Sequence, residues 1–150
     1  MRQPAVENER DTAEGGTLSD TEAVLVRDTN APRQARRYVT RVLYSLRAPA
    51  AVVEAAEIIA SELVTNSVKY GRARMVRVAL TVRAGAATIT VSDGTPYVPL
   101  PPVTPAGEDD ENGRGLFLVE ALAARWGHRC AGSEPSDGTA VWAELPWQAA

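Results

Sequence analysis

Two residue types that carry much of protein chemistry occur only once each in this sequence. Cys130 is the only cysteine, which excludes an internal disulfide and a zinc site built from several cysteines. His128 is the only histidine, and a Ser-His-Asp hydrolase or a histidine-rich metal site would need partners that are not evident. We therefore expect His128 to hold an ordinary strand position within the segment RWGHRC.

Long apolar runs and an excess of positive charge are also missing. No stretch approaches the roughly 18 apolar residues of a membrane-spanning helix, and the N-terminus carries no hydrophobic signal-peptide region. The formal net charge is -3, so the chain has no basic footprint for nucleic acid. These absences predict a cytoplasmic protein that contacts neither nucleic acid nor a membrane directly.

What remains is ordinary globular composition. A chain of 150 residues with 45% hydrophobic and 23% charged residues fits one domain with a single core. Residues 1–20 are polar, charged and aperiodic, which predicts a mobile tail, and residues 21–147 predict the domain itself. The domain should begin with a strand, followed by a helix for which Asn30 is a plausible N-cap and Pro32 lies in the first turn.

This first helix has two different sides. Its apolar residues recur at helical spacing: Ala35, Tyr38, Val39, Val42, Leu43 and Leu46. Its other side carries four arginines, which could meet an acidic partner or form a solvated face: Arg33, Arg36, Arg37 and Arg41.

A second helix and a hairpin are expected next. The helix should run from about Ala50 to Tyr70 and end at Gly71. Its buried stripe is predicted to contain Val52, Val53, Ala56, Ile59, Leu63 and Tyr70. Apolar and polar residues then alternate on both sides of the turn 84–86, which indicates two antiparallel strands.

Residues 95–112 differ in kind, because they contain five prolines and an acidic run. Neither a helix nor a central strand suits them, and a loop this long in a compact domain is usually functional or disordered. The following segment has apolar residues at helical spacing: Leu116, Val119, Leu122, Ala123 and Trp126. The segment GTAVWAELPW then predicts a last strand.

Three polar side chains interrupt the second helix. Glu62, Asn66 and Lys69 lie at i, i+4 and i+7, so they project from one side. An amide oxygen together with substrate phosphates would suit Mg²⁺, a carboxylate could accept a proton, and an ammonium could contact phosphate. The simpler interpretation is a solvated polar edge on an amphipathic helix.

Two further positions could contribute to the same chemistry. Asp93 and Gly94 close a strand, where a carboxylate could accept a hydrogen bond from an exocyclic amine such as that of adenine, or could simply form an Asp-Gly turn. The segment GRGL opens a helix, whose free N–H groups could bind an anion, or it is only a flexible hinge. Its residues are Gly113, Arg114, Gly115 and Leu116.

The order of these segments resembles the GHKL ATPases, the superfamily of gyrase and histidine kinase nucleotide-binding domains. ELVTNSVKYG is similar to the family's E-x-x-x-N box, SDGTP to its first glycine box, GRGLFLV to its second, and GTAVWAEL to the segment before its last strand. Within this superfamily, the sequences of these segments and the short length of the chain resemble bacterial anti-sigma factor serine kinases most. The first glycine box departs from the usual D-x-G-x-G, since Thr95, Pro96 and Tyr97 follow Gly94.

The resemblance implies a Bergerat-type fold, an α/β (α+β) two-layer sandwich with helices on one face of a mixed, mostly antiparallel sheet. It implies ATP between the helices and a lid at residues 95–112, with Mg²⁺ on Asn66. Glu62 would be the general base and Asp93 would bind adenine. Lys69 and the GRGL residues would contact phosphate, with Gly94 beside Asp93 and Thr139 near the adenine end.

The implied function is that of an anti-sigma factor. Such proteins bind a sigma factor, phosphorylate a serine or threonine of an anti-anti-sigma (STAS-type) antagonist, and often form homodimers. The altered glycine box keeps a second hypothesis open: an adaptor that binds ATP or a partner without catalysis. A purely structural α/β domain is the remaining alternative.

Overall fold

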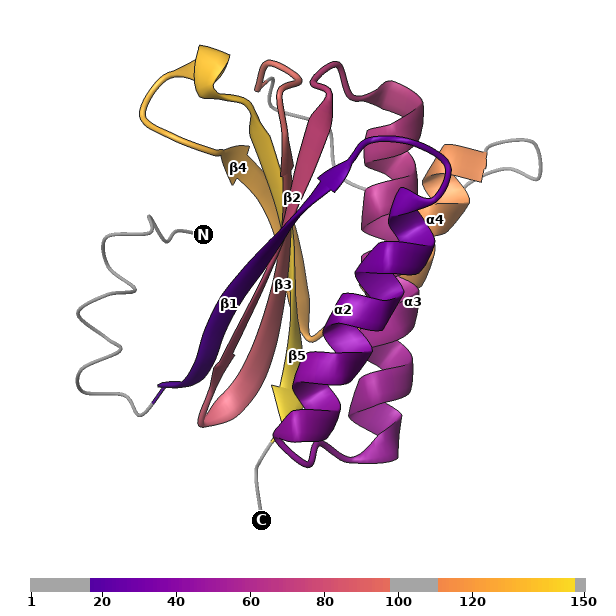
Figure 1. Cartoon of the computed structure of the whole chain (residues 1–150), viewed down its shortest axis with the longest axis vertical. Coiled ribbons are helices and arrows are strands. Elements are labelled where there is room, and N and C mark those ends of the chain that lie inside the picture. Colours follow the sequence, from indigo (N-terminus) through magenta and orange to yellow (C-terminus); the bar gives the residue numbers. More distant parts are fainter. Residues whose placement is uncertain (1–16, 98–110, 148–150) are drawn as a thin grey trace.

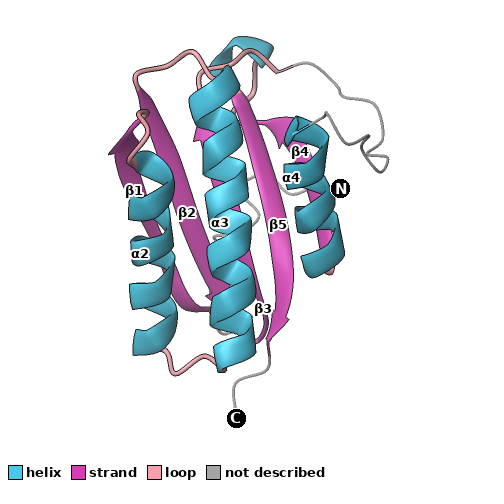
Figure 2. Cartoon of the chain, turned by 90° about the vertical axis from the view of Figure 1, so that its right-hand side faces the viewer, coloured by secondary structure: helices cyan, strands magenta, loops and turns pink. Residues whose placement is uncertain are grey.

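The computed structural model describes residues 17–97 and 111–147, and the side chains of helix α4 (Glu111–Leu122) only from Leu116 onward. These residues form one five-stranded antiparallel sheet, in which the strands lie in the order β1 (Thr17–Val26), β2 (Met75–Arg83), β3 (Gly85–Asp93), β5 (Thr139–Trp147) and β4 (Arg125–Cys130). The three helices of the described residues cover one face of the sheet, with α3 (Ala50–Tyr70) between α2 (Ala31–Ser45) and α4 (Figures 1 and 2). The two-layer α+β fold is therefore confirmed, with an antiparallel sheet rather than a mixed one.

The first two helices follow the apolar spacing of the sequence. Helix α2 spans Ala31–Ser45 and helix α3 spans Ala50–Tyr70, as expected. The N-cap of α2 is Asn30, but its side chain makes no capping hydrogen bond. Instead, Asp28 Oδ1 accepts the Asn30 N–H at 2.9 Å, and Asn30 Oδ1 accepts a hydrogen bond from Arg33 at 3.3 Å.

The strands place one apolar face toward the helices. The β2–β3 hairpin is confirmed, and Gly85 has a φ of +93°, a conformation that favours glycine. The inward side chains of β2 and β3 are buried, in the alternation that the sequence predicts: Val76, Val78, Leu80, Val82, Ala87, Ile89 and Val91.

Two expectations about buried helical residues are wrong. Helix α4 spans Glu111–Leu122, and Trp126 lies in β4 rather than continuing the helix. The backbone N–H of Ala124 already donates to Glu144 of β5, so the chain has joined the sheet by that point. Tyr70 is 55% exposed because α3 reaches the end of β3 there, so little of the sheet lies beneath its last residue.

The boundaries of the domain also differ from the expected ones. Strand β1 begins at Thr17 and not at residue 21. The polar residues 17–20 belong to the strand because they pair with β2 at the edge of the sheet, where Thr17 lies opposite Arg83. This edge position does not require the apolar alternation that the sequence argument relied on. Residues 1–16 of the predicted tail (1–20) and residues 98–110 of the predicted lid (95–112) lie outside the described residues.

Candidate nucleotide site

The two flanks of α3 carry different polar groups. Glu57 and Ser61 face α2, where Thr40 donates to Glu57 Oε2 at 2.6 Å and Arg36 donates to Ser61 Oγ at 2.9 Å. Helical spacing places Glu62, Asn66 and Lys69 together on the flank away from α2. The structure therefore brings the three predicted residues to one side.

Glu62 and Asn66 are half-buried polar groups without a partner in the described chain. Neither side chain makes a hydrogen bond or an ion pair there, whereas Lys69 is exposed and does interact with another residue. A half-buried carboxylate and amide normally have partners, because losing water without a new hydrogen bond costs free energy. Both groups are thus available to a ligand.

Asp93 ends β3 close to the C-terminus of α3. Its Oδ1 accepts the backbone N–H of Thr95 at 2.9 Å, which is an Asx turn. Its other oxygen, Oδ2, has no hydrogen bond among the described residues and would lie 3.1 Å from a Cβ built on Gly71. The simpler turn interpretation thus accounts for one carboxylate oxygen and leaves the second available for a donor.

The start of β5 packs against this strand end. Thr139 lies opposite Asp93 in the sheet, and its hydroxyl donates to the carbonyl oxygen of Thr95 at 2.9 Å. Gly138 has a φ of +107°, and a side chain there would collide with the Asp93 carbonyl oxygen. Gly94 is confined by Ala73, whose Cβ would lie 2.8 Å from a Cβ at that position. Glycine is therefore required for the close approach of these segments.

Sequence reasoning missed Arg27, which follows β1 and holds the end of α3. Its guanidinium donates to the carbonyl oxygen of Val68 at 2.9 Å, to that of Ser67 at 3.5 Å, and to that of Ala73. Carbonyls at a helix C-terminus lack intrahelical donors, and a cation there also suits the helix dipole. In the sequence Arg27 is marked only by its place directly after the apolar run AVLV, which does not identify its acceptors.

Helix α4 begins at Glu111, two residues before the predicted start. The N–H of Gly113 is therefore among the first four of the helix, which have no intrahelical acceptor, while Gly115 lies just beyond them. A phosphate contact through a free backbone N–H fits Gly113 better than Gly115. Leu116 is partly buried against the core. For Arg114 the structure describes the backbone, which lies in the first turn of α4.

His128 lies in β4, as expected, with its ring facing the helices. Its ring centroid lies 5.6 Å from that of Trp126, and its Nε2 is buried without a partner in the described chain. Burial lowers the pKa of His128, so the ring is neutral at pH 7. The described residues also contain no group of three or more His, Cys, Asp or Glu side chains that could hold a metal ion.

Comparison with known families agrees with this fold. A family model for the histidine kinase-like ATPase domain matches residues 25–144, from the end of β1 into β5. The chain belongs to this family. An uncharacterized protein of Streptomyces coelicolor is similar to the chain, with 41% identity over 69 residues that cover 45% of this chain and 66% of the relative. In the described part of the chain, no helix is long and apolar enough to cross a membrane.

Family membership assigns the chain to an ATP-binding fold. On α3 the half-buried residues without partners in the described chain are Glu62 and Asn66, and at the end of β3 Asp93 has one carboxylate oxygen, Oδ2, without a hydrogen bond there. One amide oxygen is a sufficient protein ligand for a hard cation that keeps waters and phosphate oxygens as its other ligands. The donor set therefore fits ATP with Mg²⁺.

Proposed function

We propose that the chain is an ATP-dependent anti-sigma regulatory factor with serine/threonine kinase activity. The observation that carries this proposal is the flank of α3 that holds Glu62 and Asn66, half-buried and without partners in the described chain. A protein that only bound nucleotide would need the amide but not the carboxylate. Retention of Glu62 one helical turn from Asn66 is what favours a reaction over binding alone.

The nucleotide would lie along α3 toward the end of β3. Asp93 Oδ2 would accept a hydrogen bond from the adenine amine, with Gly94 and Thr139 beside it. Asn66 Oδ1 would hold Mg²⁺, which neutralises phosphate charge when bound. Lys69, the N–H of Gly113 and Arg114 would contact phosphate oxygens.

The reaction would be transfer of the γ-phosphoryl group of ATP to a protein hydroxyl. The hydroxyl oxygen forms a bond to the γ-phosphorus while the bond from that phosphorus to the β,γ-bridging oxygen breaks, and ADP leaves. Glu62 takes the hydroxyl proton, and the exposed side of α3 next to it leaves room for an acceptor side chain. A general base typically contributes about 10² to 10⁴ in rate.

We propose a sigma factor and a STAS-type anti-anti-sigma protein as the partners, in the cytoplasm, where both would meet ATP. A homodimer is a further part of this proposal. The support is the similarity of the sequence to stand-alone anti-sigma kinases.

A second candidate function is an adaptor that binds ATP and regulates a partner without phosphotransfer. The segment after Asp93 favours it, because Thr95 is held at three points where the usual glycine box has a flexible backbone. Its N–H donates to Asp93, its hydroxyl donates weakly to the carbonyl oxygen of Tyr70 at 3.5 Å, and its carbonyl oxygen accepts from Thr139. A restrained segment here would limit how the phosphate end of the site closes.

The test is incubation of the full chain with γ-labelled ATP, Mg²⁺ and a candidate STAS-type protein. Label on a serine or threonine of that protein supports the kinase. Tight ATP binding without any transfer would contradict the kinase and leave the adaptor.

A further inference from the structure

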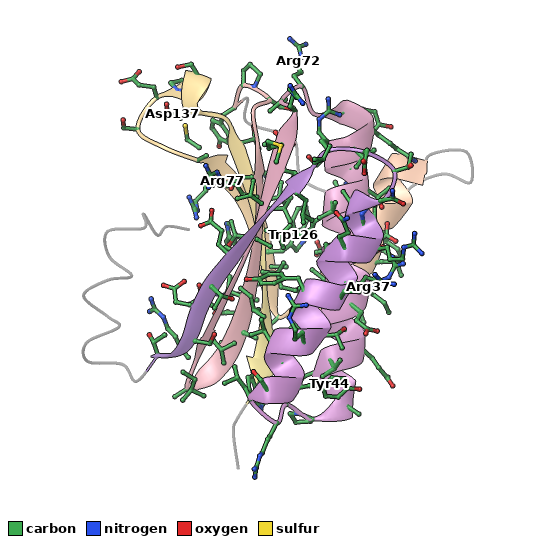
Figure 3. All side chains as sticks on the ribbon, in the orientation of Figure 1. Arg37, Tyr44, Arg72, Arg77, Trp126 and Asp137 are labelled. Atoms are coloured by element: carbon green, nitrogen blue, oxygen red, sulfur yellow. The ribbon has the colours of Figure 1, made fainter. Side chains whose placement is uncertain are left out.

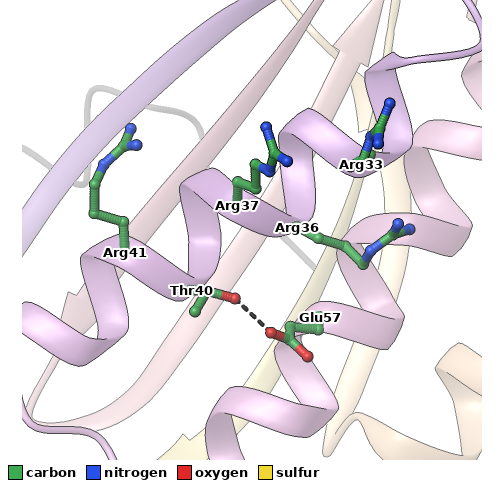
Figure 4. Close-up of a pocket in the computed structure, with 6 residues that line it drawn as sticks. All are labelled: Arg33, Arg36, Arg37, Thr40, Arg41 and Glu57. Carbon is green, nitrogen blue, oxygen red and sulfur yellow. Dashed lines mark hydrogen bonds between the residues drawn. The ribbon is translucent and has the colours of Figure 1, made fainter.

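A row of arginines lies on the face of α2 that points away from the core. Arg33, Arg37 and Arg41 follow each other at i, i+4 and i+8, and Arg36 lies beside them toward α3 (Figure 4). We call these four residues the arginine stripe. Together with Thr40 and Glu57 they line a surface hollow of about 390 Å³ between α2 and α3.

The stripe has four positive charges and few negatively charged groups beside it. Within residues 17–97 and 111–147, none of its arginines forms an ion pair; Arg36 donates to Ser61, and Arg33 to Asn30. The carboxylate of Glu57, which lines the same hollow, accepts a hydrogen bond from Thr40. This concentration of positive charge stands in a chain whose formal net charge is -3.

Arginines on the opposite face of the sheet behave differently. Arg77 pairs with Glu22 at 2.6 Å, and Arg125 pairs with Glu144 at 2.9 Å. Both pairs join neighbouring strands of the sheet, β1 with β2 and β4 with β5. On that face of the sheet carboxylates therefore pair with arginines, whereas the arginines of the stripe have no such partner among the described residues.

The geometry of the stripe selects the shape of its ligand. A helix rises about 1.5 Å per residue, so the three aligned arginines are spaced by about 6 Å along α2. Carboxylates at i, i+4 and i+8 on a second helix repeat at the same interval. A guanidinium also binds a carboxylate with two parallel hydrogen bonds, which fixes orientation as well as charge.

The surroundings of the stripe favour a protein over a nucleic acid. Helical spacing places Tyr44, which is 64% exposed, on the same face of α2 as the aligned arginines, and Figure 3 labels it with Arg37. Ile58, which is 41% exposed, follows Glu57 on α3. Tyrosine and arginine are enriched at protein interfaces, so this combination of side chains favours a protein partner.

We propose that the arginine stripe docks an acidic helical segment of a partner protein, with carboxylates at i, i+4 and i+8. The docked helix would lie along α2, on the flank of α3 opposite the candidate nucleotide site. Partner binding and nucleotide binding would therefore use different residues. The proposal rests on the proposed function only in taking the partner to be the regulated protein.

The test uses the full chain and a fluorescein-labelled, alanine-based helical peptide of about 20 residues, long enough to exceed the stripe. One peptide carries glutamates at i, i+4 and i+8, and the control peptide carries the same residues in an order that spreads them around the helix. We expect anisotropy titration to give at least about fivefold tighter binding for the aligned peptide, since docking requires the charges on one face.

The matched variants are Arg37→Ser/Arg41→Ser and Arg77→Ser/Arg125→Ser. Both lower the net charge by the same amount, the first within the stripe and the second on the other face of the sheet. The stripe variant should bind the aligned peptide about tenfold more weakly, and the control variant within about twofold of wild type. A lysine-bearing peptide should bind Arg37→Glu/Arg41→Glu better than wild type, and unchanged ATP binding by this variant would show that it is folded.

Three outcomes would overturn the proposal. Equal losses in both double variants would mean binding to net charge alone. Equal affinities for the aligned and spread peptides would show that the stripe does not dock one face of a helix. Tighter binding of a single-stranded oligonucleotide than of the aligned peptide would assign the stripe to nucleic acid. ATP titration of the same samples separates this proposal from the nucleotide site, because the stripe variant should bind ATP like wild type.

Discussion

The two flanks of α3 differ in whether their polar groups have partners. Toward α2, Glu57 and Ser61 each accept a hydrogen bond from that helix. On the other flank, Glu62 and Asn66 are half-buried and make no such bond within the described chain. Polar groups that are satisfied hold helices together, and those left without partners at similar burial are available for a ligand.

The largest effect is expected from Glu62→Ala. Loss of the proposed base should lower phosphotransfer by about 10² to 10⁴, while ATP affinity changes little, because the carboxylate acts on the acceptor hydroxyl. Single-turnover assays with labelled ATP measure the rate. Glu54→Ala, an exposed glutamate earlier on the same helix, is the control. Full turnover in Glu62→Ala would remove this residue from the chemistry.

A smaller effect on both stability and binding is expected from Arg27→Ala. The change removes charged hydrogen bonds to the carbonyl oxygens of Ser67, Val68 and Ala73, so the free energy of unfolding should fall by about 2 kcal/mol. ATP affinity should fall severalfold as well, because the end of α3 carries part of the site. Urea unfolding and ATP titration measure the two effects.

Arg72→Ala, which alters an exposed arginine two residues after α3, is the control for Arg27. Unchanged stability in Arg27→Ala would show that the C-terminal end of α3 is not stabilised by this residue.

Thr40→Val tests the satisfied flank. It removes the donor to Glu57 at nearly constant side-chain size, so stability should fall by about 1 kcal/mol. ATP affinity should stay within about twofold of wild type, since Thr40 acts between α2 and α3. A larger loss of ATP-binding free energy than of unfolding free energy would mean that the flank of α3 facing α2 also contributes to nucleotide binding.

The smallest effect concerns pH. Burial lowers the pKa of His128 below its unfolded value near 6.5, so the unfolded state binds more protons at acidic pH. This residue therefore contributes no pH dependence above about pH 6.5 and destabilises the fold as pH falls below it. His128→Gln should flatten the melting temperature between pH 7 and 5, and an unchanged slope would contradict the assignment.

Elements with strong local patterns were predictable from the sequence. Helix α3 was predicted from Ala50 to Tyr70 because apolar spacing and Gly71 mark its body and its end, and the hairpin because both strands alternate. Trp126 was misassigned because its spacing continues that of α4, whereas the actual helix end depends on pairing with β5. The start of β1 was missed for the same reason, since edge pairing leaves little trace in composition.

The candidate site was predictable in its residue types but not in its supports. Glu62, Asn66 and Asp93 stand out as polar residues in apolar elements. Arg27 could not be assigned, because its acceptors lie about 40 residues further along the chain and become neighbours only in the folded sheet. The arginine stripe was visible as a pattern, while the hollow beside it needed the packing of α2 on α3.

The most direct test of the account is calorimetric titration of ATP with Mg²⁺ into wild type, Asn66→Ala and Ser61→Ala. The two substitutions lie on opposite flanks of one helix, and each removes one polar side chain. Even outer-shell partners of a metal typically contribute 10–100-fold to affinity, so Asn66→Ala should bind at least about tenfold more weakly. Ser61→Ala should match wild type within about twofold. Equal affinity in wild type and Asn66→Ala would contradict the claim that the unpartnered flank of α3 binds the nucleotide.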